Sequence, residues 1–340
     1  MSLRRRIRSC VRQFVPLWVC LLPCLFVELF SFWIASFLWP IPHILNSDSV
    51  VILVVADPQL IGHRNEPKSI GFLSRWDADR FCATIFSCFF FNFWYLHRGY
   101  MQARRAVHPD LEVFLGDLFD EGVYLDEAQF VNERDRFLQI FPLNDRTNRI
   151  YLPGDNDIGG EMEPVYSHLY EMFKRNFPPY FRQEPSPFKQ FFSIYEQLRR
   201  INVVLSAHDH STALYMQWRQ PPRFGHIAAA SDISDVRWTV SMLEPPALPL
   251  VEFKSPTVSY RMGVPKMGYG LVVVTPFHSN GTASVQFSVL WLPSRFLQIG
   301  LFVCLVSLGV LSTLLSASGC CHRCKIVVRQ MLAKQRRRRQ

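Results

Sequence analysis

The central part of this 340-residue chain contains almost no cysteine, which excludes a disulfide framework as the basis of its fold. Of the nine cysteines in the chain, only Cys82 and Cys88 lie away from two apolar stretches near its ends. The chain also lacks internal repeats, so a repeat architecture is excluded. Its length suits one domain of moderate size with additional segments.

The chain lacks an excess of positive charge once its two tails are set aside. The formal net charge is +9, but 13 of the 37 basic residues lie in residues 1–13 and 319–340. The remainder holds 24 basic and 28 acidic residues. We therefore expect no nucleic-acid partner, and we interpret the basic tails as segments beside an anionic cytosolic membrane surface.

Two stretches have almost no charge, and each is as long as a membrane span. Residues 14–39 are apolar apart from Glu28 and a few small polar residues, and residues 296–318 carry no charge. A transmembrane helix needs about 20 such residues, so we predict one at each end. A buried core helix is the alternative for both stretches, and it has more weight for the first, because Glu28 would be costly in lipid. A cleaved signal peptide is another alternative for the first stretch, but the apolar part exceeds the ~7–15 residues of a signal h-region.

Basic residues on the outer flank of each apolar stretch predict the topology. The positive-inside rule places both termini in the cytosol. The predicted organisation is a basic tail at 1–13, a helix at 14–39, a lumenal domain at 40–293, a helix at 296–318 and a basic tail at 319–340. Asn280 begins an N-glycosylation acceptor, Asn-Gly-Thr, on the lumenal side. Three cysteines beside the second span suit S-palmitoylation, with a small zinc cluster as the alternative: Cys320, Cys321 and Cys324.

Four short apolar runs each end in residues that bind metals. The runs occupy residues 50–56, 111–115, 149–153 and 201–207. The residues that follow them are Asp57 and Gln59, Asp117 and Asp120, Asp155 and Asn156, and His208 and His210. Such runs are typical of buried strands. Ligands of open α/β sheets bind beyond the carboxyl ends of the strands, so we predict a shared metal centre there.

The rest of the central segment alternates between helix and strand signals, which predicts an α/β fold. Amphipathic patterns predict helices at 126–138, 164–177 and 188–200, and later apolar runs predict strands at 270–275 and 284–291. Residues 81–96 form an apolar run without charge that is short for a membrane span. We interpret it as a buried or interfacial helix, or as an insertion.

The ligand types suit a centre with two divalent ions. Two such ions roughly 3.5–4 Å apart can clamp a phosphoryl group and lower the pKa of a bridging water. One carboxylate must bridge both ions, and Asp117 is the natural candidate. Singly, each aspartate is more often a turn residue or helix cap, and a histidine pair is more often ordinary loop chemistry. The combination in one chain favours the metal centre.

These motifs, in this order, resemble the calcineurin-like metallophosphoesterases. Within them the chain is most similar to the membrane-anchored metallophosphoesterase 1 family, which removes ethanolamine phosphate from a mannose of glycosylphosphatidylinositol (GPI) anchors. The matching stretches are VVADPQLIG, RWDADR, FLGDLFDEG, PGDNDIGGE, LSAHDHS and SPTVSYRMGVPKMGYG. They extend from about residue 50 to residue 275, and the two predicted anchors also match.

The resemblance implies a site, a fold and a place of action. One metal would be held by Asp57, Gln59, Asp117 and His210, and the other by Asp117, Asp155 and His208. The ions would be manganese, with zinc or iron as alternatives. The implied fold is a four-layer β-sandwich flanked by helices, with one transmembrane helix at each end. The implied substrates are GPI-anchored proteins or GPI glycolipids in the endoplasmic reticulum (ER) and Golgi lumen, which would aid ER-to-Golgi transport.

The chain departs from the family pattern at several places. Asn156 occupies the position of the usual catalytic histidine, and Gln59 replaces a more usual histidine. With Asp120, Asn156 is our candidate catalytic residue. The interval from 157 to 201 is too short for the two strands and the histidine ligand that the family has there. Its only histidine is His168. The run at 81–97 has no counterpart in the family. We therefore consider a gene-model error or a splice variant.

Three functions compete. The first is a lumenal metal-dependent phosphodiesterase. The second is a catalytically impaired relative that acts as a membrane-anchored binding or trafficking protein, which Asn156 and the missing histidine favour. The third is a phosphomonoesterase acting on proteins or nucleotides, which the subfamily motifs and the two anchors do not favour. Metal content and phosphodiester hydrolysis distinguish the first two.

Overall fold

The computed structural model describes nine segments of the chain: residues 3–41, 48–62, 95–161, 164–180, 203–219, 222–228, 235–241, 250–277 and 282–315. It divides into two compact units, one of residues 1–31 with 295–340 and one of residues 32–294. Asn280, the helix predicted at 188–200, most of the 81–97 run and every cysteine beyond Cys304 lie outside the described segments.

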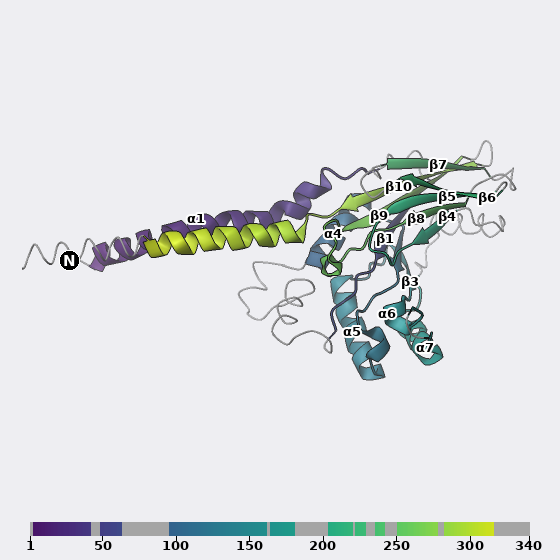
Figure 1. Cartoon of the computed structure of the whole chain (residues 1–340), viewed down its shortest axis with the longest axis horizontal. Helices are drawn as coiled ribbons and strands as arrows, with labels where there is room; N and C mark the ends of the chain where they lie inside the picture. The colour runs from purple at the N-terminus through teal and green to yellow at the C-terminus, as the bar shows by residue number, and fades with distance from the viewer. Residues whose placement is uncertain are drawn as a thin grey trace, which may run out of the picture. The chain divides into compact units, whose positions relative to one another are not determined.

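Two β-sheets form the larger unit (Figure 1). The six-stranded sheet has the order β3-β2-β1-β9-β10-β7, and the four-stranded sheet has the order β4-β8-β5-β6. The strands are β1 (Val50–Ala56), β2 (Leu111–Leu115), β3 (Asn148–Leu152), β4 (Val203–Ser206), β5 (Ala213–Arg219), β6 (Pro222–Ala228), β7 (Asp235–Ser241), β8 (Leu250–Lys254), β9 (Gly268–Phe277) and β10 (Thr282–Trp291). All four runs that precede candidate ligands are strands, as predicted.

The parallel arrangement of three strands gathers the candidate ligands at one edge. β1 pairs in parallel with β2, and β2 with β3, so that Ala56, Leu115 and Leu152 are aligned. β9 and β10 are antiparallel additions to the same sheet. The loops after β1, β2 and β3 therefore leave the sheet side by side.

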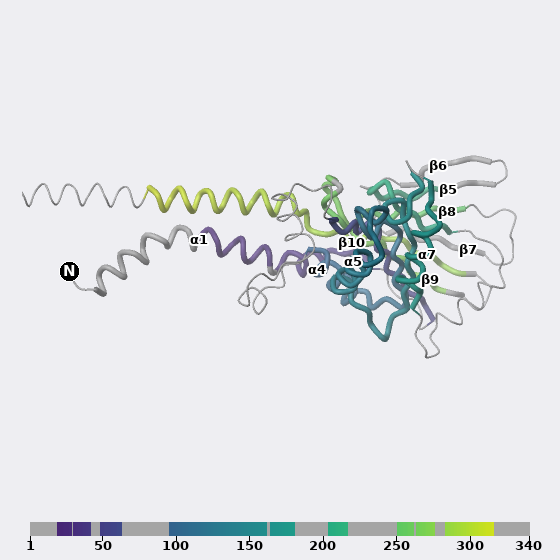
Figure 2. The backbone as a smooth tube through the Cα atoms, turned by 90° about the horizontal axis from the view of Figure 1, so that it is seen from below, coloured from purple at the N-terminus to yellow at the C-terminus, as the bar shows by residue number. Residues whose placement is uncertain are grey.

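Helices cover one face of the six-stranded sheet, and the four-stranded sheet covers the other. Alternate side chains of β1 point to opposite faces. Val51, Leu53 and Val55 join a core with the helices, whereas Val50 and Val54 join a second core between the sheets. The helices are α4 (Tyr95–Val107), α5 (Glu127–Ile140), α6 (Asp155–Ile158) and α7 (Ser167–Asn176), with 3-10 turns η1 (Gly122–Tyr124) and η2 (Tyr260–Met262) (Figures 1 and 2).

The described residues therefore form three layers of a mixed α/β fold, and the fourth layer stays a prediction. The helices predicted at 126–138 and 164–177 are confirmed as α5 and α7. Asp126 caps α5: its side chain accepts a hydrogen bond from Gln129 N at 2.8 Å. The end of the 81–97 run is helical and buried, since α4 begins at Tyr95 and both Tyr95 and Leu96 are 1% exposed.

One helix in the described segments is long and apolar enough to cross a membrane. It extends over Arg295–Leu315. α1 (Leu3–Ser36) contains two apolar pieces, Val19–Glu28 and Phe30–Ser36, which are bent by 45° and qualify as a span only when taken together. The transmembrane helix predicted at 296–318 therefore has a matching helix, and the one predicted at 14–39 is not confirmed.

A buried polar network joins these two terminal segments within the smaller unit. Arg295 Nη1 donates to Glu28 Oε2 at 2.6 Å and to Gln298 Oε1 at 2.8 Å. Gln298 Nε2 donates to Ser31 Oγ at 2.8 Å. Glu28 and Arg295 are 6% and 5% exposed. Glu28, which would be costly in lipid as an isolated charge, is thus paired.

Candidate metal centre

The candidate ligands lie on the loops that leave the parallel strands. Asp57 and Gln59 follow β1, Asp117 follows β2, and Asp155 is the first residue of α6 after β3. A fourth loop follows β4, a strand of the second sheet, and it carries His208 and His210. The backbone N–H of His208 donates to Asp57 Oδ2 at 3.1 Å, which joins loops that are 151 residues apart. The site therefore includes loops from both sheets.

The backbone at these ligands has an unusual conformation. Six non-glycine residues in the described segments have a positive φ, and five are candidate ligands: Asp57, Gln59, Asp117, His208 and His210. Their φ angles range from 40° to 82°. Non-glycine residues rarely adopt this region, and such strain concentrates at functional sites. The surrounding loops hold these side chains in place against a local energetic preference.

Glycine lets the loops after β2 and β3 approach each other closely. A Cβ on Gly154 would lie 2.0 Å from Asp117 Oδ1 and 2.3 Å from Asp117 N. Gly116 has a φ of 67°, and a Cβ there would lie 3.1 Å from the Cα of Gly154. Gly154 therefore provides the space that Asp117 occupies.

Three ligand atoms converge into a group that suits one metal ion. Asp117, Asp155 and His208 each offer one atom, and the three atoms lie within 4.8 Å of one another. His208 Nδ1 is 3.1 Å from Asp155 Oδ1. Two carboxylates and an imidazole are a donor set that Zn²⁺, Mn²⁺ and Fe²⁺ accept. This is the set that the resemblance assigns to the metal with the missing histidine.

Gln59 connects Asp117 to His210. Its Nε2 lies 3.1 Å from Asp117 Oδ2 and 3.3 Å from His210 Nε2. A half-turn of the amide would bring Oε1, a possible metal ligand, to the same place, because amide oxygen and nitrogen are interchangeable in shape. Asp57 lies nearby, but its carboxylate accepts a hydrogen bond from the His208 N–H. The ligand set predicted for the first metal, Asp57, Gln59, Asp117 and His210, lies next to this group. Its members converge less closely than Asp117, Asp155 and His208.

Asn156 contacts Asp117 directly. Its backbone N–H donates to Asp117 Oδ1 at 3.1 Å, and its Nδ2 donates to Asp117 Oδ2 at 3.2 Å. The side chain therefore orients Asp117. An amide has no proton to release near neutral pH, so Asn156 cannot act as a general acid.

Asp157 holds two of the ligand loops together, a role that was not predicted from the sequence. Its buried carboxylate accepts hydrogen bonds at 3.0 Å from the backbone N–H groups of Leu118, Phe119 and Gly154. One side chain thus connects the loop after β2 to the loop after β3. Its place two residues after Asp155 in PGDNDIGGE was the available signal.

Burial and mutual repulsion shift the pKa values of the site. Burial, followed by the neighbouring Asp117, raises the pKa of Asp57 to about 7. Burial and then Asp155 also raise the pKa of Asp117. Partial burial acts to lower the pKa of His208, but Asp155 and the other nearby carboxylates outweigh it and the pKa rises. Several acids crowded in one buried place favour a bound cation.

Asp120, a candidate catalytic residue, lies apart from the gathered ligands. Arg261 Nη2 donates to Asp120 Oδ2 at 3.3 Å, and Arg261 Nη1 donates to the backbone oxygen of Gln59, also at 3.3 Å. Asp120 therefore forms an ion pair and is not part of the group that suits a metal. Arg261 belongs to the stretch SPTVSYRMGVPKMGYG, but no role for it was predicted.

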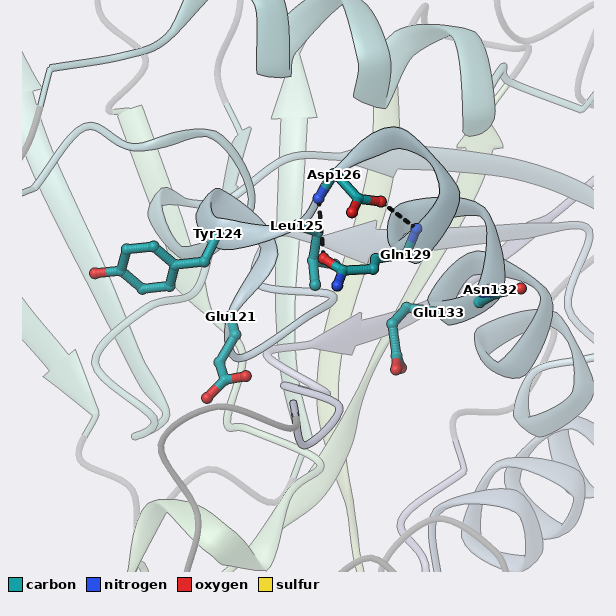
Figure 3. A pocket seen from close by; sticks show the side chains of 7 residues that line it. All are labelled: Glu121, Tyr124, Leu125, Asp126, Gln129, Asn132 and Glu133. Carbon is teal, nitrogen blue, oxygen red and sulfur yellow. Dashed lines mark hydrogen bonds between the residues drawn. The ribbon is translucent and has the colours of Figure 1, made fainter.

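A separate pocket opens beside the start of α5 (Figure 3). Its volume is about 550 Å³. Glu121, Tyr124, Leu125, Asp126, Gln129, Asn132 and Glu133 line it, and none of these is a candidate ligand. The Asp126 and Gln129 cap lies on its wall in Figure 3. The pocket therefore belongs to the η1–α5 surface and not to the gathered ligands.

The chain is similar to curated proteins named metallophosphoesterases. A Metallophosphoesterase 1 homolog of Drosophila melanogaster is 29% identical over 38% of this chain and 30% of its own length. Another from Caenorhabditis elegans is 28% identical over 48% and 40%, respectively. Cell division control protein 1 of Saccharomyces cerevisiae is 31% identical over 42% of this chain and 26% of its own length.

These similarities cover less than half of either chain. The matched segments span between about a quarter and two fifths of the length of these relatives. No family model matches the chain. The resemblance to the metallophosphoesterase 1 family is nevertheless confirmed, and the names of the relatives support a family of phosphoric ester hydrolases.

Proposed function

We propose that this chain is a metal-dependent phosphodiesterase that removes ethanolamine phosphate from a GPI-anchor mannose in the ER and Golgi lumen. The observation that carries the proposal is the convergence of Asp117, Asp155 and His208 at the carboxyl ends of the strands. The similarity to proteins named Metallophosphoesterase 1 supports the same reaction class. Substrate, compartment and the aid to ER-to-Golgi transport follow from the resemblance.

The chemistry assigned to each residue follows from its contacts. Bound divalent ions, which we expect to be two manganese ions, would supply a Lewis acid and an activated water for attack on phosphorus. Asp117 would serve both ions, and Asn156 orients its two oxygens. Asp155 and His208 would hold one ion with it, and Asp57, Gln59 and His210 would hold the other.

Asn156 limits the rate that we expect. General acid catalysis typically contributes ~10²–10⁴-fold, and an amide cannot supply it. The leaving mannose hydroxyl must then take its proton from water. We expect slow turnover and a preference for substrates with acidic leaving groups, such as aryl phosphodiesters.

Membrane anchoring would keep the site near a lipid-linked substrate. The helix Arg295–Leu315 is long and apolar enough to cross a membrane and would be one anchor. We propose that the bent segment within α1 is the second, with both termini in the cytosol. Its buried Glu28 pairs with Arg295 of the other helix, which would reduce the cost of placing either charge in lipid.

Metal content and hydrolysis of the purified full chain test this function. We expect about two equivalents of bound metal and slow hydrolysis of an aryl phosphodiester. We also expect loss of ethanolamine phosphate from a GPI glycan, followed by mass spectrometry. Asp117→Asn should abolish both the bound metal and the turnover. Asp135→Asn is the matched control, because Asp135 is an exposed carboxylate on α5.

A second candidate function has a specific observation in its favour. Asn156 at the usual histidine position suits a catalytically impaired relative that binds or escorts its ligand. Metal-loaded protein that hydrolyses neither substrate, and in which Asn156→His creates turnover, would support this alternative over the enzyme. Hydrolysis by the unaltered chain that Asp117→Asn removes would exclude it.

A further inference from the structure

The segment that ends in η2 is attached to the end of β1. Thr257 forms a parallel bridge with Ala56, and Val258 N donates to Ala56 O at 3.0 Å. Thr257 Oγ1 donates to the backbone oxygen of Asp57 at 2.9 Å. These contacts bring a residue 200 positions away in the sequence beside the metal-ligand loop, and they place Arg261 one turn further on.

Arg261 reaches across two ligand loops at once. Its Nη1 contacts Gln59 O in the loop after β1, and both terminal nitrogens lie 3.3 Å from Asp120 Oδ2 in the loop after β2. The side chain of Arg261 is 11% exposed, and that of Asp120 is 26% exposed. The planar guanidinium suits such a double contact, whereas a lysine ammonium offers a single point charge.

The two loops also depend on each other through their backbones. Gln59 N donates to Asp117 O at 2.9 Å, and Asp120 N donates to Leu60 O at 3.0 Å. Gln59 has a φ of 40° in this arrangement. Holding a non-glycine residue in this region is energetically unfavourable. Contacts on the Gln59 backbone are therefore what keep its amide beside Asp117 and His210.

We propose that Arg261 and Asp120 form a positioning pair that fixes the Gln59 amide at the metal centre. The inference rests on the proposed function only in assuming that the gathered ligands bind metal. Neither residue belongs to the converging group of Asp117, Asp155 and His208. Asp120 acts through Arg261, Arg261 acts through the Gln59 backbone, and Gln59 faces Asp117 and His210. In this proposal Asp120, our candidate catalytic residue, acts on the site only through Arg261.

Calorimetric titration of the metal-free full chain with Mn²⁺ in detergent micelles tests the pair. Arg261→Gln and Asp120→Asn should each weaken one of the two binding events by about 10–100-fold, the usual loss when a residue that orients a metal ligand is removed. The double variant should be no weaker than either single one, because both remove the same contact. Arg261→Lys should recover part of the affinity. Arg134→Gln, which breaks an ion pair on α5, is the control and should bind like the parent.

The pH profile of aryl phosphodiester hydrolysis separates positioning from proton transfer. A positioning role leaves the profile of Asp120→Asn unshifted while metal affinity falls. Unchanged metal affinity together with a lost limb of the profile would overturn the proposal and make Asp120 a proton donor. A parent chain that binds Mn²⁺ but hydrolyses nothing would refute the phosphodiesterase function and leave the positioning pair to be decided by the titration. A parent chain that binds no metal would refute both.

Discussion

Backbone strain and burial at single residues shape the candidate centre. Asp57, Gln59 and Asp117 are all at most 4% exposed, and each has a positive φ. Their side chains are fixed before any ion arrives, which reduces the ordering that binding requires. The same rigidity makes the centre sensitive to any added volume behind Asp117.

Gly154→Ala is expected to damage the centre through added volume alone. Its Cβ would overlap both Asp117 Oδ1 and Asp117 N, so the β2 loop must move. We expect a loss of about 1–3 kcal/mol in unfolding free energy and weaker Mn²⁺ binding in calorimetry. Gly300→Ala is the control, because its Cβ meets open space. Unchanged Mn²⁺ affinity in Gly154→Ala would contradict the assignment of Asp117 as a ligand.

The metal-free protein is expected to lose stability as the pH rises. Burial and then Asp117 raise the Asp57 pKa from its ordinary 3.8 to about 7 in the folded state. A raised folded-state pKa gives stability that is complete below the unfolded value and is lost as pH rises through the folded value. Asp117 shifts in the same direction. His210, whose pKa is lowered by burial and then by His208, acts in the opposite direction.

Thermal unfolding in chelator measures this effect. The midpoint temperature of the parent should decrease as the pH is raised from 5 to 7.5. The decrease should be smaller in Asp57→Asn. Mn²⁺ at about 100 times its dissociation constant should restore about 2.7 kcal/mol at pH 7.5. A midpoint that rises with pH in chelator would show that the carboxylates are not protonated in the folded protein.

At the scale of elements, the buried network between α1 and the helix Arg295–Leu315 is the feature that joins two ends of the chain. Glu28 and Arg295 lie 267 residues apart in sequence and 2.6 Å apart in space. Gln298 and Ser31 extend the network. Removal of one partner from a buried ion pair is strongly destabilising, because it leaves an unpaired buried charge.

A double-mutant cycle on this pair should be strongly non-additive. Glu28→Leu and Arg295→Leu should each lower the thermal midpoint in detergent, with a cost on the order of 3–5 kcal/mol. The variant with both changes should be more stable than the weaker single one. Val310→Ala, at a side chain 45% exposed on the same helix, is the control. Additive losses would mean that the two charges do not interact in the protein.

At the scale of the whole molecule, one compact unit contains residues 1–31 and 295–340, and the other contains the sheets that carry the candidate centre. The similarity to metallophosphoesterases lies over less than half of the chain. The anchoring arrangement is therefore a proposal that the basic tails and apolar helices support on their own.

The proposed topology predicts where modification and proteolysis occur. Protein made in microsomes should carry a glycan, so that endoglycosidase treatment increases its mobility on a gel. Asn280→Gln should remove this glycan and with it the mobility shift. Protease added outside sealed microsomes should remove epitope tags from both termini and spare the central segment. A tag at the N-terminus that stays protected would contradict a second span in α1.

The sequence by itself determined the strands β1 to β4, β9 and β10, the helices α5 and α7, and the types of ligand at the strand ends. These features depend on local patterns: β1 alternates between two cores, and Asp126 caps α5 through a neighbouring residue. A strand pattern and a ligand type can both be seen within about ten residues. The departure at Asn156 was visible in the same way.

Only the tertiary structure decided which of these residues meet. His208 reaches Asp57 and Asp155 because β4, in the second sheet, ends beside loops of the first sheet. Arg261 takes Asp120 as its partner, and Arg295 takes Glu28, across 141 and 267 residues. Such distances depend on sheet order and packing, which side-chain periodicity does not encode. The ligands could therefore be identified from the sequence, whereas the pairing of Asp120, our candidate catalytic residue, with Arg261 could not.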